Sequence, residues 1–256
     1  MMRMAKLCAA AATAALLSAA APAPASAADG TMSPENRAAI ENIVRDYILS
    51  NPEIIMEAVE RLRAKQRMAE ESADRQALES NRAALLADPN SHVGGNPKGD
   101  VTIVEFFDYR CGVCKRIHPI VEELVRSDGN IRRIYKEWPI LGPDSVIASR
   151  AAIASRAQGK YPEFHKAMME AKAALDEARI LQIAASVGLD TARLRKDMDS
   201  PAVEKVIAAN YALADKLKLN GTPSFLIGDR LLRGGRDLES LRAIVAEARA
   251  DAKKQK

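Results

Sequence analysis

Residues 101–119 read VTIVEFFDYRCGVCKRIHP, and this stretch decides the fold. Its first part, Val101–Phe107, is β-branched, apolar or aromatic apart from Glu105, which predicts a buried strand. A helix is predicted to start at Cys111, and Cys114 falls in its first turn. The two thiols are therefore expected where a strand gives way to a helix.

This placement predicts thiol–disulfide exchange. The reaction needs a thiolate nucleophile and a second thiol that resolves the mixed disulfide. Cys111 would meet the unpaired backbone N–H groups and the positive end of the helix dipole, so we expect its pKa to be lowered. Arg110, Lys115 and Arg116 would add positive charge nearby. Cys114 would be more buried and act as the resolving thiol.

Stability is a poor explanation for the cysteine pair. A disulfide across Cys111 and Cys114 closes a very small loop and restrains little of the unfolded chain. The third cysteine, Cys8, lies in an N-terminal segment that we expect to be removed. We therefore predict a redox-active disulfide and no other cofactor.

Three further features accompany the cysteines. Glu105 points either into the core or to the surface; in the core its carboxylate would relay a proton to or from Cys114, and on an edge strand it would be a solvated acid. Pro119 is predicted to kink the helix. Thr222 and Pro223 precede a predicted strand, which suggests a cis X-Pro bond that presents backbone groups to a substrate strand. Taken alone, the motif would instead indicate an ordinary turn.

The first 27 residues have the build of a secretory signal peptide. Arg3 and Lys6 form a basic head, an Ala- and Leu-rich run covers residues 7–20, and Ala25–Ala27 offers a cleavage site. The alternative is an uncleaved anchor, but the run is shorter than the ~20 residues of a spanning helix. We expect export through the inner membrane to the periplasm.

The bulk composition fits one substantial domain with an appendage. The 256 residues are 48% hydrophobic and 28% charged. Two of the 38 Lys and Arg residues lie in the signal, which brings the mature chain close to neutrality against 34 Asp and Glu residues. We therefore expect no nucleic-acid partner. Residues 251–256 are interpreted as a solvated basic tail.

Residues 28–88 are predicted to be helical. Ser33–Glu35 and Asn51–Glu53 each carry helix-start signals, and apolar residues follow both at helical spacing. We favour a stalk through which copies of the chain associate, because such stripes must be buried somewhere. A hairpin folded back on the catalytic domain is the alternative. The polar stretch Glu70–Ser80 is interpreted as a semi-rigid or partly melting linker.

Residues 89–250 are predicted to form an α/β domain. Gly and Pro residues between positions 89 and 99 mark its boundary. The elements expected after the first strand are a helix to about Ser127, a strand at Ile131–Trp138, a helical block at about 144–219, a hairpin from Ser224–Ile227 and Leu231–Arg233, and a helix at Leu238–Arg249. This order predicts a mixed sheet with a helical insertion.

The run Glu105–Lys115, together with Pro119 and Gly221–Pro223, resembles the DsbA-like thioredoxin family. The resemblance extends from Asn90 to about Ala250. It implies a thioredoxin fold with Cys111 as nucleophile, Cys114 as resolving thiol, Glu105 as buried acid and Thr222–Pro223 as the cis-proline, substrate-binding loop.

The N-terminal helices are similar to the stalk of the suppressor-of-copper-sensitivity C (ScsC) proteins. That resemblance implies a homotrimer, disulfide isomerase activity on misoxidised exported proteins, a membrane thiol reductase of the DsbD or ScsB type, and a link to copper tolerance. One feature departs from the strongly oxidising DsbA type, which has Pro-His between its cysteines. Gly112 and Val113 stand here, so we expect weaker thiolate stabilisation and favour an isomerase.

Two alternatives remain open at this level. A monomeric oxidase would use the same cysteines in the opposite resting redox state. A copper-binding module would use Cys111, Cys114 and His118 as soft donors, although no second cysteine pair closes a tetrahedral site. We interpret His118 as a helix-surface or packing residue.

Overall fold

The structure is a computed structural model that describes residues 32–254. The predicted signal peptide, Cys8 and the last two residues of the basic tail lie outside the described residues. The chain divides into two compact units between Arg61 and Leu62. Among the described residues, no helix combines the length and the apolar character needed to cross a membrane.

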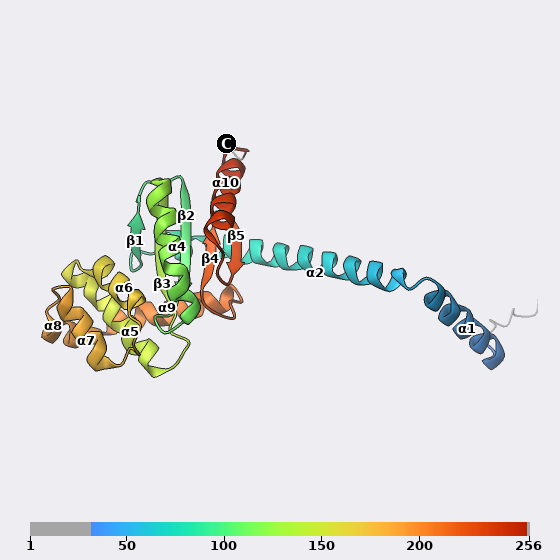
Figure 1. The fold of residues 1–256 in the computed structure, drawn as a ribbon, viewed down its shortest axis with the longest axis horizontal. Helices are drawn as coiled ribbons and strands as arrows, with labels where there is room; N and C mark the ends of the chain where they lie inside the picture. The colour runs from blue at the N-terminus through green and yellow to red at the C-terminus, as the bar shows by residue number, and fades with distance from the viewer. Residues whose placement is uncertain (1–31, 255–256) are drawn as a thin grey trace, which may run out of the picture. The chain divides into compact units, whose positions relative to one another are not determined.

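Helices make up most of both units (Figure 1). They are α1 (Pro34–Ser50), α2 (Glu53–Ser80), α3 (Arg82–Leu86), α4 (Gly112–Asp128), α5 (Pro143–Ser155), the 3-10 turn η1 (Arg156–Gln158), α6 (Tyr161–Glu170), α7 (Glu177–Ser186), α8 (Thr191–Met198), α9 (Pro201–Lys216) and α10 (Leu238–Lys254). The strands are β1 (His92–Gly95), β2 (Val101–Phe107), β3 (Ile131–Glu137), β4 (Ser224–Ile227) and β5 (Arg230–Arg233).

Helix α1 begins as its sequence predicts. The Ser33 side chain accepts a hydrogen bond from the backbone N–H of Asn36, and Pro34 occupies the first turn. None of its side chains is buried. The exposed large apolar residues of this unit are Met32, Ile40, Ile43, Val44, Tyr47, Leu49, Ile55 and Met56.

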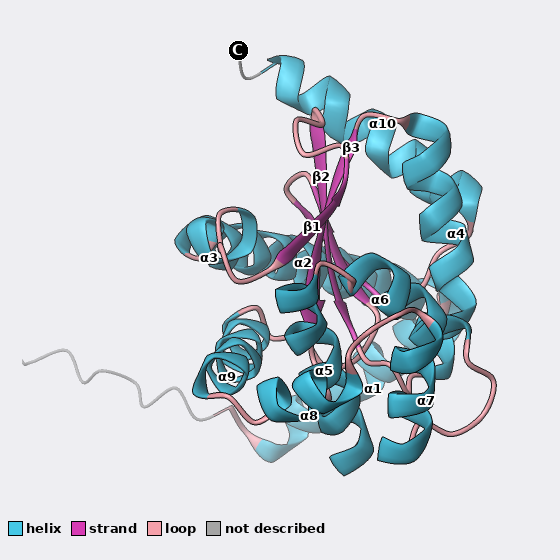
Figure 2. Ribbon diagram, turned by 90° about the vertical axis from the view of Figure 1, so that its left-hand side faces the viewer, coloured by secondary structure: helices cyan, strands magenta, loops and turns pink. Residues whose placement is uncertain are grey.

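The second unit is built on a five-stranded sheet in the order β1-β3-β2-β4-β5. Strands β2 and β3 are parallel, and the other neighbours are antiparallel. Figure 2 shows α4 and α10 on one side of the sheet and α3 and α9 on the other. Successive side chains of β2 point to opposite faces of the sheet, which explains this arrangement. Ile103 packs with α4 and α10, whereas Val104 and Phe106 pack with α9.

Between β3 and β4 the chain forms the predicted helical insertion, α5 to α9. Its core is apolar and includes Met168 and Met169, both buried. Phe107 and Cys114 belong to the same cluster, so the insertion packs directly against the end of β2 and the start of α4. The thioredoxin fold with a helical insertion is confirmed.

Strand β1 was not predicted, because Gly94 and Gly95 were interpreted as part of a boundary loop. The strand pairs antiparallel with β3. A Cβ atom at Gly94 would come within 3.0 Å of the Tyr135 ring, and Gly95 has a φ of +66°. The two glycines therefore allow close approach to β3, although glycine weakens the sequence signal of a strand.

The polar stretch Glu70–Ser80 also differs from its interpretation as a linker. Helix α2 continues unbroken to Ser80, and Leu78 is buried in one core cluster with Leu85 of α3. Asp74 accepts two hydrogen bonds of 3.0 Å from Arg233 on β5. Residues before the expected boundary at 88 therefore pack within the domain, because a few apolar side chains in a polar sequence are enough to anchor a helix.

Candidate active site

The two cysteines lie at the start of α4. Cys111 is the N-cap residue, and its Sγ accepts a hydrogen bond of 3.3 Å from the backbone N–H of Cys114. The same thiol donates to the Thr222 carbonyl at 3.3 Å. Both cysteines are free thiols; Cys111 is 7% exposed and Cys114 is fully buried. One sulfur is thus at the surface of the site and the other behind it.

The surroundings lower the pKa of Cys111 to about 5. The largest cause is a hydrogen bond from the Cys114 side chain. Burial opposes it and raises the pKa. Smaller lowering contributions come from the Thr222 side chain and from the backbone N–H groups of Cys114 and Val113. The pKa of Cys114 is raised, first by its hydrogen bond to Cys111, then by burial, and also by the charge of Glu105. At neutral pH, Cys111 is a thiolate and Cys114 a thiol.

Nearby cations contribute less to the lowered pKa of Cys111 than the sequence predicts. Lys115 is turned away, since its Nζ donates to the carbonyls of Met168 and Ala171 at 2.8 Å, at the end of α6. Arg110 donates to the Leu141 carbonyl at 2.9 Å and faces Asp144. Hydrogen bonds, rather than these side-chain charges, are the main causes of the lowered pKa of Cys111.

Asp108 holds the loop before Cys111, and the sequence analysis missed it. Its carboxylate is buried and accepts hydrogen bonds from the backbone N–H groups of Arg110 at 2.7 Å and Leu141 at 3.0 Å. Its carbonyl accepts from Cys111 N at 3.0 Å. Asp108 comes directly after a strand and three residues before a helix cap. An Asp in such a position often accepts hydrogen bonds from backbone N–H groups of the turn that follows, so the sequence did carry a signal for this role.

The loop that precedes β4 lies beside Cys111. The peptide bond between Thr222 and Pro223 is cis. Pro223 is buried, whereas Thr222 is partly exposed and its carbonyl contacts the Cys111 sulfur. The structure thus brings together the residues predicted as nucleophile and substrate-binding loop, which are far apart in the sequence.

The dipeptide between the cysteines is exposed. Gly112 lies at the surface, and a Cβ atom there would be 3.6 Å from the Arg116 guanidinium. Val113 is 36% exposed and Leu141 is 44% exposed. Two exposed apolar side chains and one cation therefore lie on or near the segments that flank the cysteines.

Glu105 lies in the core, which is one of the two placements expected from the sequence; the alternative, a solvated acid on an edge strand, is wrong. Its carboxylate is 2.7 Å from Arg133 Nη2, and both side chains are buried. Arg133 also pairs with Glu122, which is half exposed. Arg133 was missed because β3 carries several charged residues, and the sequence does not show which of them point into the core. Together these residues form a charged chain that runs from near Cys114 towards solvent.

His118 is buried, so its interpretation as a helix-surface residue is wrong, whereas packing is right. Its ring lies 5.2 Å from that of His165, measured between centroids. Within residues 32–254, no group of three or more His, Cys, Asp or Glu side chains is placed to hold a metal ion. Cys111, Cys114 and His118 therefore do not converge as three metal donors.

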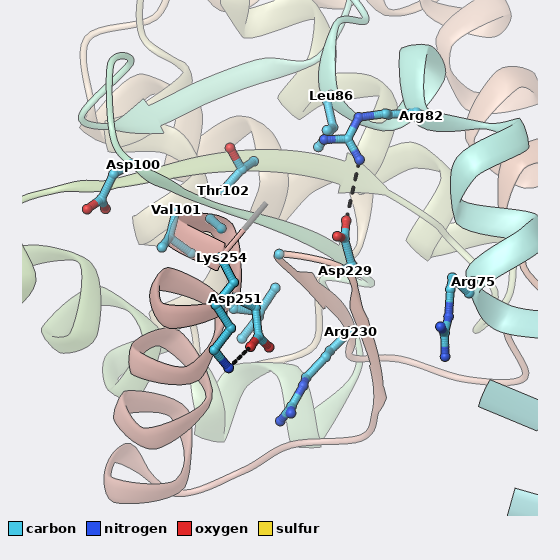
Figure 3. Close-up of a pocket in the computed structure, with 14 residues that line it drawn as sticks. Arg75, Arg82, Leu86, Asp100, Val101, Thr102, Asp229, Arg230, Asp251 and Lys254 are labelled. Carbon is cyan, nitrogen blue, oxygen red and sulfur yellow. Dashed lines mark hydrogen bonds and ion pairs between the residues drawn. The ribbon is translucent and has the colours of Figure 1, made fainter. Parts of the chain in front are cut away.

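A pocket of about 500 Å³ lies elsewhere in the second unit (Figure 3). Its lining includes neither cysteine, and no residue of α4 or of the cis-proline loop. Two of its ion pairs are internal: Arg82 with Asp229 at 3.4 Å, and Lys254 with Asp251 at 3.1 Å. The pocket lies apart from both cysteines and from the cis-proline loop, so it is not the candidate active site.

Comparison with known proteins agrees with this geometry. A family model described as Thioredoxin matches residues 87–247. The chain belongs to the thioredoxin family. A second model, described as Copper resistance protein ScsC N-terminal domain, matches residues 36–69, so this thioredoxin-family chain is of the DsbA-like, ScsC type.

Solved structures support the same assignment. A thioredoxin-like oxidoreductase from Silicibacter pomeroyi DSS-3 is 50% identical, with 66% of this chain and 98% of that chain covered and a TM-score of 0.65. The thiol-disulfide exchange protein alpha-DsbA2 from Wolbachia pipientis is 31% identical (70% and 97%, TM-score 0.66). Proteus mirabilis ScsC in a transitional conformation is 30% identical (86% and 100%, TM-score 0.64).

Curated relatives of greater length also match. The Na(+)/H(+) antiporter NhaA 1 of Salinispora arenicola (strain CNS-205) is 32% identical over 164 residues. The match covers 63% of this chain and 25% of that protein, so the chain spans about a quarter of the length of this relative. A match of that extent carries no antiporter activity to this chain.

Proposed function

We propose that this chain is a periplasmic thiol–disulfide oxidoreductase that acts as a disulfide isomerase on exported proteins. The observation that carries the proposal is the placement of two free thiols at the start of α4, with Cys111 as its N-cap beside the Thr222 carbonyl and Cys114 fully buried. The pKa of Cys111 is lowered to about 5 and that of Cys114 is raised. A thiolate that reacts first and a protonated thiol that waits behind it are what stepwise disulfide exchange requires.

In the first step, the Cys111 thiolate attacks one sulfur of a substrate disulfide. A bond forms between Cys111 and that sulfur, the substrate S–S bond breaks, and the other substrate sulfur leaves as a thiolate. In isomerisation, that thiolate attacks a different substrate disulfide, and a later substrate thiolate releases Cys111. In the alternative exit, Cys114 attacks Cys111, which releases a reduced substrate and an oxidised enzyme.

The loop at Thr222–Pro223 would bind the substrate chain. Its position beside Cys111 places backbone groups next to the reacting sulfur, where an extended peptide can add main-chain hydrogen bonds. Val113 and Leu141 are exposed on the open side and would contact apolar side chains that flank a misplaced disulfide. We assign the catalytic roles to Cys111 and Cys114, and that of a buried acid to Glu105.

The sequence between the cysteines favours isomerase over oxidase. The more a protein stabilises its reduced form, the stronger an oxidant it is. Gly112 and Val113 provide no imidazole to stabilise the thiolate further. A membrane thiol reductase of the DsbD or ScsB type would keep the pair reduced.

The N-terminal unit would join copies of the chain into a homotrimer. Exposed Ile43, Val44 and Tyr47 lie at helical spacing on α1, and copies of the same helix offer a matching apolar surface. The match to an ScsC N-terminal domain supports this part of the proposal. A trimer would present three Cys111 thiolates to one substrate, which would suit the reshuffling of several disulfides. Copper tolerance would follow from the repair of disulfides that copper induces.

The test uses the full mature chain and a variant with two charges in the apolar stripe, Ile43→Glu with Tyr47→Glu. The matched control is Asn42→Glu, which adds charge on the opposite side of α1. Light scattering gives the mass, and refolding of scrambled ribonuclease gives isomerase activity. The proposal expects the double variant to be monomeric and to lose isomerisation while it keeps dithiol oxidation. A monomeric native chain, or full isomerase activity in the double variant, would refute it.

A further inference from the structure

An exposed arginine lies over the dipeptide between the cysteines. Arg116 follows Gly112 by one turn of α4, and a Cβ atom at Gly112 would lie 3.6 Å from the Nη1 atom of Arg116. Both residues are exposed. The positive charge of this guanidinium group therefore faces solvent beside the residue that follows Cys111.

The loop between β5 and α10 borders the same segment. The backbone N–H of Gly234 donates a hydrogen bond of 2.9 Å to the carbonyl of Pro223, which ties this loop to the cis-proline turn. A Cβ atom at Gly235 would lie 2.5 Å from Ile117 and 3.5 Å from Val113, so glycine permits a close approach to α4. The loop therefore contacts both the cis-proline turn and the start of α4.

Arg236 places a second positive charge on this loop. Its Nη1 atom donates to the carbonyl of Gly235 at 2.9 Å and to the carbonyl of Arg233 at 3.3 Å. The acid that follows it, Asp237, directs both carboxylate oxygens to Ser240 at the start of α10. The exposed guanidinium group is therefore held over the loop by neutral carbonyl groups.

Neither arginine is neutralised by an ion pair. Within residues 32–254, no carboxylate oxygen lies within 4.0 Å of a guanidinium nitrogen of Arg116 or Arg236. Arg110 gives a contrast, since Asp144 lies 3.6 Å from its Nη1 atom. Exposed charges attract an incoming anion over about 8 Å at physiological salt. The surface around the cysteine segment thus presents two positive charges that are available to a ligand.

We propose that this chain prefers substrate disulfides flanked by acidic residues, which Arg116 and Arg236 bind while Cys111 attacks. A substrate strand on the Thr222–Pro223 loop would lie beside the start of α4 and the loop after β5, where the two guanidinium groups are. Guanidinium groups bind carboxylates through charge-assisted hydrogen bonds. The inference rests on the proposed function and names the class of substrate that its site favours.

The expected preference is modest and depends on salt. One ion pair between exposed side chains contributes little by itself. Two such pairs act together, and the same charges raise the rate of encounter with an acidic substrate and lower it with a basic one. Both effects weaken as salt screens the charges. A preference for acidic substrates that disappears at high salt is therefore the signature of this surface.

Peptides with the sequence Ala-X-Cys-X-Ala, in which X is Glu, Gln or Lys, test the inference. Each peptide cysteine carries 5-thio-2-nitrobenzoate in a disulfide. Attack of the Cys111 thiolate on the peptide sulfur forms a new S–S bond, breaks the old one and releases the coloured thiolate. Each rate constant of the reduced mature chain is divided by that of 2-mercaptoethanol with the same peptide, which removes differences in the reactivity of the peptides themselves.

The charge-reversal variant is Arg116→Glu with Arg236→Glu. The matched control is Lys98→Glu with Lys205→Glu, which changes the net charge equally. Lys98 precedes the start of β2, whereas the cysteines follow its end, and Lys205 lies on α9, across the sheet from α4 (Figure 2). All four side chains are exposed. Because the readout is a ratio within one chain, a change in the pKa of Cys111 cancels.

At about 20 mM salt we expect the native chain to react roughly 3–10-fold faster with the Glu peptide than with the Lys peptide, and at about 0.5 M salt less than about 2-fold faster. The charge-reversal variant should prefer the Lys peptide, and the control should keep the native order. Equal normalised rates in the native chain, or an equal loss of preference in the control, would overturn the inference. No release from any peptide would instead refute the proposed function.

Discussion

At the residue scale, the chemistry depends on the difference between two cysteines three positions apart. Cys111 caps α4 and collects hydrogen bonds from Cys114, Thr222 and backbone N–H groups. Cys114 is fully buried, and Glu105 adds negative charge near it. The same short segment therefore stabilises a thiolate at one sulfur and a thiol at the other, and no metal or organic cofactor is needed for this asymmetry.

Thr222 is expected to tune the nucleophile. Thr222→Ala removes one of the hydrogen bonds that lower the pKa of Cys111 while Pro223 stays in place. The pKa should rise, and each unit of rise lowers the thiolate fraction at pH 4 about tenfold. Iodoacetamide alkylation at pH 4 should slow several-fold, with equal rates at pH 9. Equal rates at pH 4 would show that Thr222 does not stabilise the thiolate.

The ion pair between Glu105 and Arg133 makes a second prediction at this scale. Arg133→Met leaves the buried Glu105 carboxylate without its partner, which should lower the free energy of unfolding by about 3–5 kcal/mol. Urea denaturation measures this loss. Adding Glu105→Gln to the same chain removes the unpaired charge and should recover most of that loss. A double variant as unstable as Arg133→Met would show that the pair is not what stabilises this part of the core.

At the element scale, Glu137 at the end of β3 accepts a hydrogen bond from Tyr161 on α6, and its carbonyl accepts one from Asn210 on α9. Burial raises the pKa of Glu137 to about 6. The folded state therefore binds the proton of the Glu137 carboxyl more tightly than the unfolded state does. The stability that this protonation contributes is full below pH 4.5 and is lost as the pH rises through about 6.

Glu137→Gln should therefore flatten the pH dependence of stability between about pH 4.5 and 6. The native chain should lose unfolding free energy across this window, and the variant should lose less. Urea titrations at half-unit pH steps measure both. Parallel curves for the two proteins would mean that Glu137 titrates alike in the folded and unfolded states.

The end of α2 and the short helix α3 give a stability prediction of their own. Leu85 is 1% exposed, so Leu85→Ala should cost about 2–5 kcal/mol. Met56→Ala, at a side chain that is 60% exposed, is the matched control and should change stability by less than about 0.5 kcal/mol. If Leu85→Ala unfolds at the same urea concentration as the native chain, this segment does not belong to the folded domain.

Some of these elements could be predicted from local sequence patterns, and others could not. The β-branched run at Val101–Phe107, the cysteine pair and the hairpin before α10 are strong local signals, and each element forms close to its predicted bounds. β1 was missed because Gly94 allows packing against Tyr135 and Gly95 allows packing against the Ile131 backbone, and both are contacts between distant residues. Arg133 was missed, and His118 was left between a surface and a packing role, for the same reason: a side chain's burial depends on the fold around it.

At the scale of the whole molecule, the chain joins a thioredoxin-family domain to a helical unit whose large apolar side chains are exposed. Residues of α2 belong to both units, since the division falls within this helix. A chain of this kind is expected to hide its exposed apolar stripe against further copies. We predict three copies of the mature chain per particle by light scattering, and a mass that falls on dilution would indicate weaker association.

The central claim is that Cys111 is a thiolate at neutral pH. The direct measurement is the rate of Cys111 alkylation by iodoacetamide from pH 3 to pH 10, in a Cys114→Ala chain and in the native chain. In the native chain we predict a midpoint near pH 5 and an upward shift in the variant, because the hydrogen bond from Cys114 is the largest cause of the lowered pKa. A native midpoint near 8.5, the value of a free cysteine, would contradict the account.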